Sequence, residues 1–398
     1  MRSANLLEWM FALVGPVGLA CGSVLMKFPE WLGGAISSTC VAAFSKKAEP
    51  APEERIEASA DDPVDSFPDW PSEPGPVQSL VDEMLKQSRY ALLLRPQLVE
   101  NLSVEQLIRT RAALSDGMCL VPEGQVVLHR GAGICDGDGE AAAHGSVPVY
   151  VSAFYLDRYP VTNAQFHDFV ASGGYEQMAI WDQEIWPAVL DFVDHSGHPG
   201  PRFWHNGRYP RGEGKHPVVG ISWYEAAAFS RWAGKRLVTD AEWIKAGSWP
   251  VALEGHPLLQ RRYPWGEAMD RSRANLWGSG PGRTVSVDQF PGGVSVGGVQ
   301  QLIGNVWEWT ADAFSLESPD AAVGLEKTHF KSLRGGAFDT YLDTQATCHF
   351  QSGDRALARK HNIGFRSAIN LGDLIKRDSG YEAVPSQPVE PSQAETQR

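Results

Sequence analysis

The feature that most constrains this chain is a body, residues 118–370, that is rich in Trp, Gly and Pro and has few long periodic runs. Eleven of the fourteen Trp residues of the 398-residue chain lie in residues 118–369. A buried aromatic ring removes about 150–250 Å² from water, so such rings can stabilise a fold with little regular structure. The sequence therefore predicts short helices and strands joined by tight turns.

Composition limits the possible functions. The chain is 43% hydrophobic, which excludes a wholly disordered protein. Its net charge of −13 excludes general electrostatic binding to nucleic acid. The five cysteines form no CxxC pair and are too scattered for a disulfide framework, so the redox compartment stays open. They are Cys21, Cys40, Cys119, Cys135 and Cys348.

The amino-terminal segment, residues 1–45, contains a long apolar run. Residues 9–26 carry no charge, and this length just reaches what a bilayer requires. Three interpretations stay open: a membrane anchor or export signal, a hydrophobic packing helix, or a wrongly assigned start. The first predicts a membrane-associated or exported protein, and the other two leave a cytoplasmic location.

Two segments have a composition typical of chain segments that do not form a hydrophobic core. Residues 46–78 hold seven prolines and nine acidic against three basic side chains, which predicts an extended linker. Residues 371–398 are similar and predict a disordered tail.

Helices are predicted where a capping residue precedes an apolar stripe. Residues 79–117 should form a helical hairpin, with one helix from about Ser79 that ends before Pro96 and a second that begins after Ser103. Three more capping boxes lie in the body, at Thr162 with Gln165, Ser222 with Glu225 and Thr239 with Glu242. Strands are predicted at residues 125–128, at 149–155 and around Phe365.

Six short motifs follow one another in the body. They are FYLDRYPVTN (154–163), HPVVGISW (216–223), KRLVTDAEW (235–243), GNVWEW (304–309), LRGGAF (333–338) and NIGFR (362–366). Their order and spacing resemble the formylglycine-generating enzyme family, also called sulfatase-modifying factor domains, over about 250 residues. The resemblance implies an α+β, C-type-lectin-like fold with sparse secondary structure over residues 118–370.

The resemblance also implies structural calcium. The first implied site comprises Gln301, the carbonyl groups of Gly304 and Val306, and the carboxylate of Glu308, since oxygen ligands suit this ion. A second implied loop begins at Asn275 and Leu276. The alternative is that Glu308 is structural, because a buried carboxylate must be paired.

The reaction centre of the family is changed in this sequence. Members that make formylglycine use two copper-binding cysteines, four and nine residues beyond the second glycine of the Arg-Gly-Gly motif. Those positions hold Thr340 and Gln345 here, which supply no thiolate. Cys348, His349 and His361 are the remaining candidates for a catalytic redox centre, with copper or iron undetermined. A small buried hydrophobe is the alternative for Cys348.

A second possible metal cluster comprises Asp191, Asp194, His195 and His198. The alternative is that this segment is a surface loop.

Three functions remain open. The first is a metal-dependent oxidoreductase of this family that acts on a protein or small molecule. The second is a catalytically inactive, lectin-like module that binds a peptide or protein partner. The third, a hypervariable ligand-display protein, ranks last because residues 336–364 are poor in Asn.

Overall fold

The computed structural model describes residues 77–129, 146–252, 256, 258–314 and 330–374. The chain divides into two units, Met1–Trp70 and Pro71–Arg398, and the described residues all belong to the second. The apolar run 9–26, almost all of the predicted linker and most of the predicted tail lie outside them. In the part of the chain that is described, no helix is long and apolar enough to cross a membrane.

The described strands form two four-stranded sheets and one two-stranded ribbon. The first sheet has the order β1-β4-β10-β5 and is antiparallel throughout. The second has the order β8-β7-β6-β9, in which β6 and β9 are parallel. The ribbon pairs β2 with β3. The strands are β1 Met118–Val121, β2 Gly124–His129, β3 Ser146–Val151, β4 Phe154–Asp157, β5 Arg236–Leu237, β6 Trp307–Ala313, β7 Phe330–Arg334, β8 Ser352–Arg355, β9 Ile363–Phe365 and β10 Ser367–Asn370.

The four predicted capping boxes are confirmed. At Ser103, Thr162, Ser222 and Thr239, the side-chain oxygen accepts a hydrogen bond from the backbone N–H three residues later. Because this pairing is local, the sequence alone could locate these helix starts. The described α-helices are α2 Val77–Lys86, α3 Tyr90–Leu93, α4 Pro96–Val99, α5 Val104–Gly117, α6 Asn163–Ala171, α7 Trp186–Val189, α8 Trp223–Trp232, α9 Asp240–Ser248 and α10 Leu371–Leu374.

Three predicted boundaries were wrong. The first helix of the hairpin is interrupted after α2, because Ser88 has a φ of 58°, which lies outside the helical region. The strand predicted at 149–155 is two strands, since β3 pairs with β2 whereas β4 pairs with β1 and β10. The body also extends beyond residue 370, because α10 follows β10 directly.

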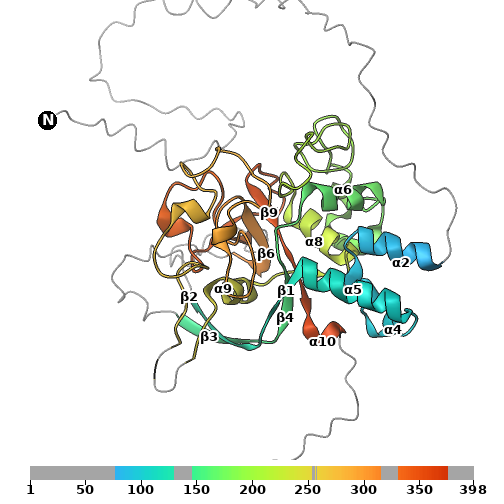
Figure 1. The fold of residues 1–398 in the computed structure, drawn as a ribbon. Helices are drawn as coiled ribbons and strands as arrows, with labels where there is room; N and C mark the ends of the chain where they lie inside the picture. The colour runs from blue at the N-terminus through green and yellow to red at the C-terminus, as the bar shows by residue number, and fades with distance from the viewer. Residues whose placement is uncertain (1–76, 130–145, 253–255, 257, 315–329, 375–398) are drawn as a thin grey trace, which may run out of the picture. The chain divides into compact units, whose positions relative to one another are not determined.

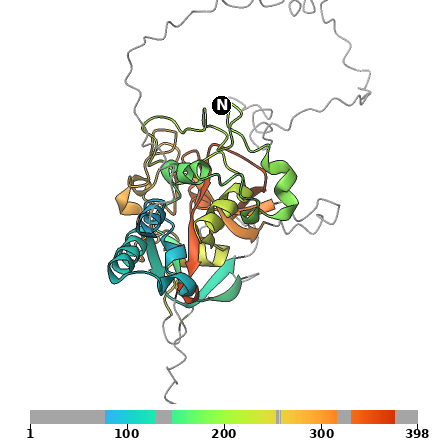
Figure 2. The ribbon, with the colours of Figure 1, turned by 90° about the vertical axis from the view of Figure 1, so that its right-hand side faces the viewer.

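Figures 1 and 2 show α2–α5 gathered on one side of the body, beside β1.

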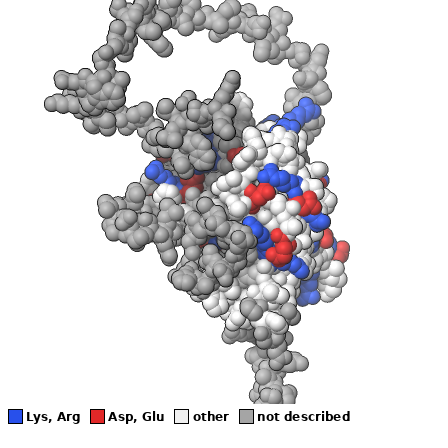
Figure 3. Space-filling view, turned by 90° about the vertical axis from the view of Figure 1, so that its left-hand side faces the viewer, with Lys and Arg blue, Asp and Glu red and all other residues white. Residues whose placement is uncertain are grey.

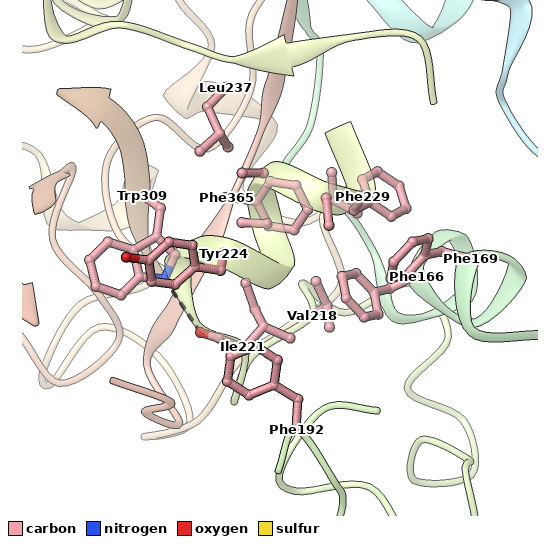
Figure 4. Close-up of a cluster of buried hydrophobic side chains, with 14 of the residues drawn as sticks. Phe166, Phe169, Phe192, Val218, Ile221, Tyr224, Phe229, Leu237, Trp309 and Phe365 are labelled. Atoms are coloured by element: carbon pink, nitrogen blue, oxygen red, sulfur yellow. Dashed lines mark hydrogen bonds between the residues drawn. The ribbon is translucent and has the colours of Figure 1, made fainter. Parts of the chain in front are cut away.

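Aromatic rings fill the largest core cluster, as the Trp-rich sequence predicts. Phe229 of α8 stacks on Phe166 of α6, with ring centroids 5.4 Å apart, and meets Phe365 of β9 edge-on at the same distance. The indole of Trp309 donates to the carbonyl of Ile221 at 3.4 Å (Figure 4). Two helices and the second sheet therefore share one apolar core.

A buried ion pair joins the two four-stranded sheets. The guanidinium of Arg366, between β9 and β10, contacts both carboxylate oxygens of Glu308 on β6, at 2.6 and 2.8 Å. It also donates to the carbonyl of Asp157 on β4 at 3.0 Å and to that of Gln300 at 2.9 Å. Both ion-pair partners are 0% exposed. This bidentate pair therefore holds the two sheets in a defined relation.

Asp168 on α6 makes the stability of the helical region depend on pH. Burial raises the pKa of Asp168 to about 6, with Lys86 opposing and Glu83 reinforcing the shift. Since the folded pKa lies above the unfolded value, ionisation of Asp168 destabilises the fold near pH 7, and this penalty disappears as the pH falls from 6 to 4. We expect Asp168→Asn to stabilise the protein at pH 7 by about 1 kcal/mol after allowance for solvent screening. Urea unfolding at pH 4, 5, 6 and 7 should show this advantage shrinking towards pH 4. Asp116→Asn, at an exposed position on α5, is the control.

Candidate functional site

The residues of the first implied calcium site are held by protein groups. Both oxygens of Glu308 contact Arg366, and one also accepts from the indole of Trp243 at 2.8 Å. The side-chain oxygen of Gln301 accepts from the amide of Asn305 at 2.7 Å. The N–H of Val306 donates to the carbonyl of Gly304 at 2.9 Å. This arrangement fits the structural alternative for Glu308 and does not fit an oxygen cage for calcium.

The second implied loop is tied to the first through Asn305. The side-chain oxygen of Asn305 accepts from the amide of Asn275 at 3.0 Å, and its own amide donates to the carbonyl of Val285. The N–H of Leu276 donates to the hydroxyl of Ser279. The buried Oδ1 of Asn275 has no hydrogen-bond partner among the described residues, and an amide oxygen of this kind can bind a cation. Asn305 was not identified from the sequence as a residue of this region. The signal that could have identified it is its residue type, because Asn adopts a positive φ more readily than most residues, and Asn305 has a φ of 66°.

Chelation tests the calcium prediction. Because the carboxylate of Glu308 is already paired with a guanidinium, we expect EDTA to leave the melting temperature of the purified chain unchanged. A fall of several degrees that added calcium reverses, with magnesium as the control ion, would show that the implied site is occupied in solution.

Thr340 and Gln345 occupy the two positions at which the resemblance implies cysteines. The hydroxyl of Thr340 is buried and accepts from the N–H of Ala337 at 2.8 Å. Gln345 ends a short 3₁₀ helix, Asp343–Gln345. Neither side chain can supply the thiolate that a Cu(I) site needs, so these positions do not fit the family's copper centre.

The three predicted catalytic residues lie in different surroundings. Cys348 is fully buried, its sulfur packs against Gly247 of α9, and burial raises the pKa of its thiol far above the ordinary value. A thiol in that state is a poor nucleophile and a poor metal ligand. The backbone carbonyl of His349 accepts from Arg334 at 3.1 Å. The side chain of His361 is 63% exposed and lies 3.8 Å from the carboxylate of Asp339. The structure thus agrees with the small-hydrophobe alternative for Cys348.

A cleft lies close to His361. Its volume is about 660 Å³, and it lies between residues 191–202 and residues 357–360. The ring of Phe203 connects the cleft to His361, with centroids 5.8 Å from His195 and 6.4 Å from His361. The charged or ionisable residues of its lining are Asp191, Asp194, His195, Arg202, Arg359 and Lys360.

One guanidinium holds the two walls of the cleft together. Arg359 donates to the carbonyls of Val193 at 2.9 Å and Gly220 at 3.1 Å. It also pairs with the fully buried carboxylate of Glu225 on α8 at 3.0 Å. The hydroxyl of Tyr175 donates to the same carboxylate at 2.7 Å. Burial raises the pKa of Glu225, and the charge of Arg359 opposes that rise. The cleft therefore has a preformed floor.

The second predicted metal cluster is a turn. Both oxygens of Asp194 are occupied, since Oδ1 accepts from the N–H groups of Ser196 and His198 and Oδ2 from that of Gly207 at 2.7 Å. Burial alone would raise the pKa of Asp194, but the hydrogen bond from the Ser196 hydroxyl, together with the backbone ones, holds it below the ordinary value. Among the described residues, no group of three or more His, Cys, Asp or Glu side chains is arranged to hold a metal ion.

Surface charges of both signs are interspersed. On the face in Figure 3, basic and acidic side chains alternate. Exposed pairs such as Arg271 with Asp343 and Arg273 with Asp270 are examples of this mixing in the structure. No extended basic surface is visible on that face.

The comparisons with known proteins identify the family. Residues 104–371 match the model of the sulfatase-modifying factor enzyme 1-like domain. The chain is 38% identical to hercynine oxygenase of Mycobacterium tuberculosis over 185 residues, which cover 44% of this chain and 41% of that protein. It is 32% identical to the formylglycine-generating enzyme of Mus musculus over 268 residues, which cover 59% of this chain and 68% of that enzyme.

A solved structure is also similar. PvdO from Pseudomonas aeruginosa matches with a TM-score of 0.43 and 19% identity, over 64% of this chain and 94% of that one. The chain spans about half the length of the hercynine oxygenases that it matches. The mixed helices and sheets, together with the family match, confirm the predicted α+β, C-type-lectin-like fold. Since the matched domain covers more than half of its residues, the chain belongs to the sulfatase-modifying factor enzyme 1-like family.

Proposed function

We propose that this chain is a binding member of the family, which recognises a peptide or small-molecule partner at the cleft between residues 191–202 and 357–360. One observation carries the proposal: the buried hydroxyl of Thr340 and the amide of Gln345 stand where the resemblance requires thiolates. The unmatched amino-terminal residues 9–26 are our proposed membrane anchor or export signal, which would present the body to its partner.

The residues of the cleft have two different roles in binding: some fix its loops, and others contact the partner. Arg359 and Glu225 fix the loop that carries the cleft, so little ordering is needed when a partner binds. His195, Arg202 and Asp191 are exposed at its surface and can contact the partner directly. The apolar side chain of Leu357, 53% exposed, adds a hydrophobic contact.

A second candidate is an oxidoreductase whose copper or iron is held by groups other than a cysteine pair. The observation that favours it is the 38% identity to a protein named hercynine oxygenase. In this candidate the cleft would hold the substrate, and His361 beside Asp339 is an exposed ionisable group that reaches the cleft lining through the ring of Phe203.

Metal analysis combined with oxygen uptake separates the two candidates. The purified full chain should be analysed for copper and iron and then incubated with a cysteine-containing peptide in an oxygen electrode. The binding proposal predicts far less than one metal ion per chain and oxygen uptake equal to that of buffer. Stoichiometric metal with sustained uptake would contradict it. In that event, Ala replacements of Cys348, His349 and His361 would show which of them retains the metal.

A further inference from the structure

Three ionisable side chains of the cleft lining are available to a bound molecule. Within the described ranges, no hydrogen bond or ion pair engages the guanidinium of Arg202, the imidazole of His195 or the carboxylate of Asp191. All three residues are exposed. Exposed charges are common on protein surfaces, but these three line a cavity whose floor is already fixed.

The other charged groups of the lining have protein partners. Arg359 is paired with Glu225, and Lys360 lies 2.5 Å from the carboxylate of Asp354. The oxygens of Asp194 are occupied by backbone N–H groups. The charged groups that remain to interact with a bound molecule are therefore mainly the guanidinium of Arg202 and, elsewhere in the lining, the carboxylate of Asp191.

His195 and Arg202 both line the cleft, and a hydrogen bond fixes the backbone of each. The N–H of His195 donates to the carbonyl of Trp204 at 3.2 Å, and its ring contacts Phe203, the neighbour of Arg202. The N–H of Arg202 donates to the carbonyl of Gly220 at 2.9 Å, which fixes its backbone. A guanidinium presents a planar fork of donors that matches a carboxylate, and an imidazole can add one more donor.

We propose that Arg202 and His195 form a binding site for a carboxylate group, with Leu357 contacting an apolar part of the same ligand. This proposal deepens, and rests on, the binding function proposed above. The carboxylate of Asp191 repels a second negative charge, so the site favours a monoanionic carboxylate over a doubly charged phosphate. The ligand class is thus a small or peptide-borne carboxylate beside an apolar group.

Three probes that differ only in their head group test the site. Benzoate, phenyl phosphate and benzyl alcohol should be titrated into the full chain at constant ionic strength and pH 7, with binding followed by calorimetry. We expect benzoate to bind best, and Arg202→Gln to weaken it by roughly tenfold or more. Arg211→Gln, at an exposed position outside the cleft lining, should bind benzoate like the unmodified chain. Asp191→Asn should strengthen binding of phenyl phosphate.

Several results would overturn the carboxylate site. These are no binding of benzoate, equal binding by Arg202→Gln and the unmodified chain, equal binding of benzyl alcohol, or a preference for phenyl phosphate. Melting curves of each variant, with Arg202→Lys as a variant that keeps the charge, exclude misfolding as the cause of a loss. Metal-dependent oxygen uptake together with Arg202-dependent benzoate binding would refute the binding-only function while leaving the carboxylate site intact.

Discussion

Replacing Arg366 with Met is expected to lower the free energy of unfolding by about 3–5 kcal/mol, the cost of removing one partner of a buried ion pair. The change leaves the carboxylate of Glu308 buried without its counter-charge and removes the donors to the carbonyls of Asp157 and Gln300. A loss of this size is a large fraction of the stability of an ordinary domain. Urea unfolding followed by tryptophan fluorescence measures it.

Arg283→Met is the matched control for Arg366→Met. The side chain of Arg283 is 73% exposed and lies 3.9 Å from its partner Glu213. We expect this change to alter stability by no more than about 0.5 kcal/mol. Equal small effects of the two substitutions would show that the pair between Arg366 and Glu308 does not hold the sheets together.

Replacing Glu225 with Gln is expected to cost about 3 kcal/mol and to loosen the cleft. Arg359 would lose its counter-charge while its guanidinium still binds the carbonyls of Val193 and Gly220. Hydrogen exchange of residues 191–202 should then become faster than in the unmodified protein, because their anchor is weakened.

Glu184→Gln is the control for the cleft. Glu184 is exposed and accepts from the hydroxyl of Tyr224 at 3.1 Å, so its loss should be nearly neutral. Unchanged exchange of residues 191–202 in Glu225→Gln would contradict the role of the buried pair as the anchor of the cleft.

Local features of the fold could be predicted from the sequence, whereas long-range pairing could not. The capping boxes at Ser222 and Thr239 need only residues three positions apart. Strands β6 and β7 were not predicted, because their pairing depends on distant residues, such as Glu308 opposite Arg334 and Trp307 beside Ile363. Several predicted features, including the apolar run 9–26, lie outside the described residues and stay predictions.

The candidate site was harder to predict than the fold. The motifs identified the altered positions Thr340 and Gln345, but sequence alone could not show that Cys348 is fully buried. The cleft depends on the contact between Arg359 and Val193, which are 166 positions apart in the chain. Only the folded structure brings His195, Arg202 and Lys360 to one cavity.

The most direct test of the central claim is whether the chain converts a peptide cysteine into an aldehyde. The full chain would be supplied with copper and a thiol reductant, incubated with a cysteine-containing peptide in air, and the peptide examined by mass spectrometry and by reaction with a hydrazide probe. Because the two thiolate positions hold Thr340 and Gln345, the account predicts unchanged peptide. Aldehyde formed by the unmodified chain at multiple turnovers would contradict it.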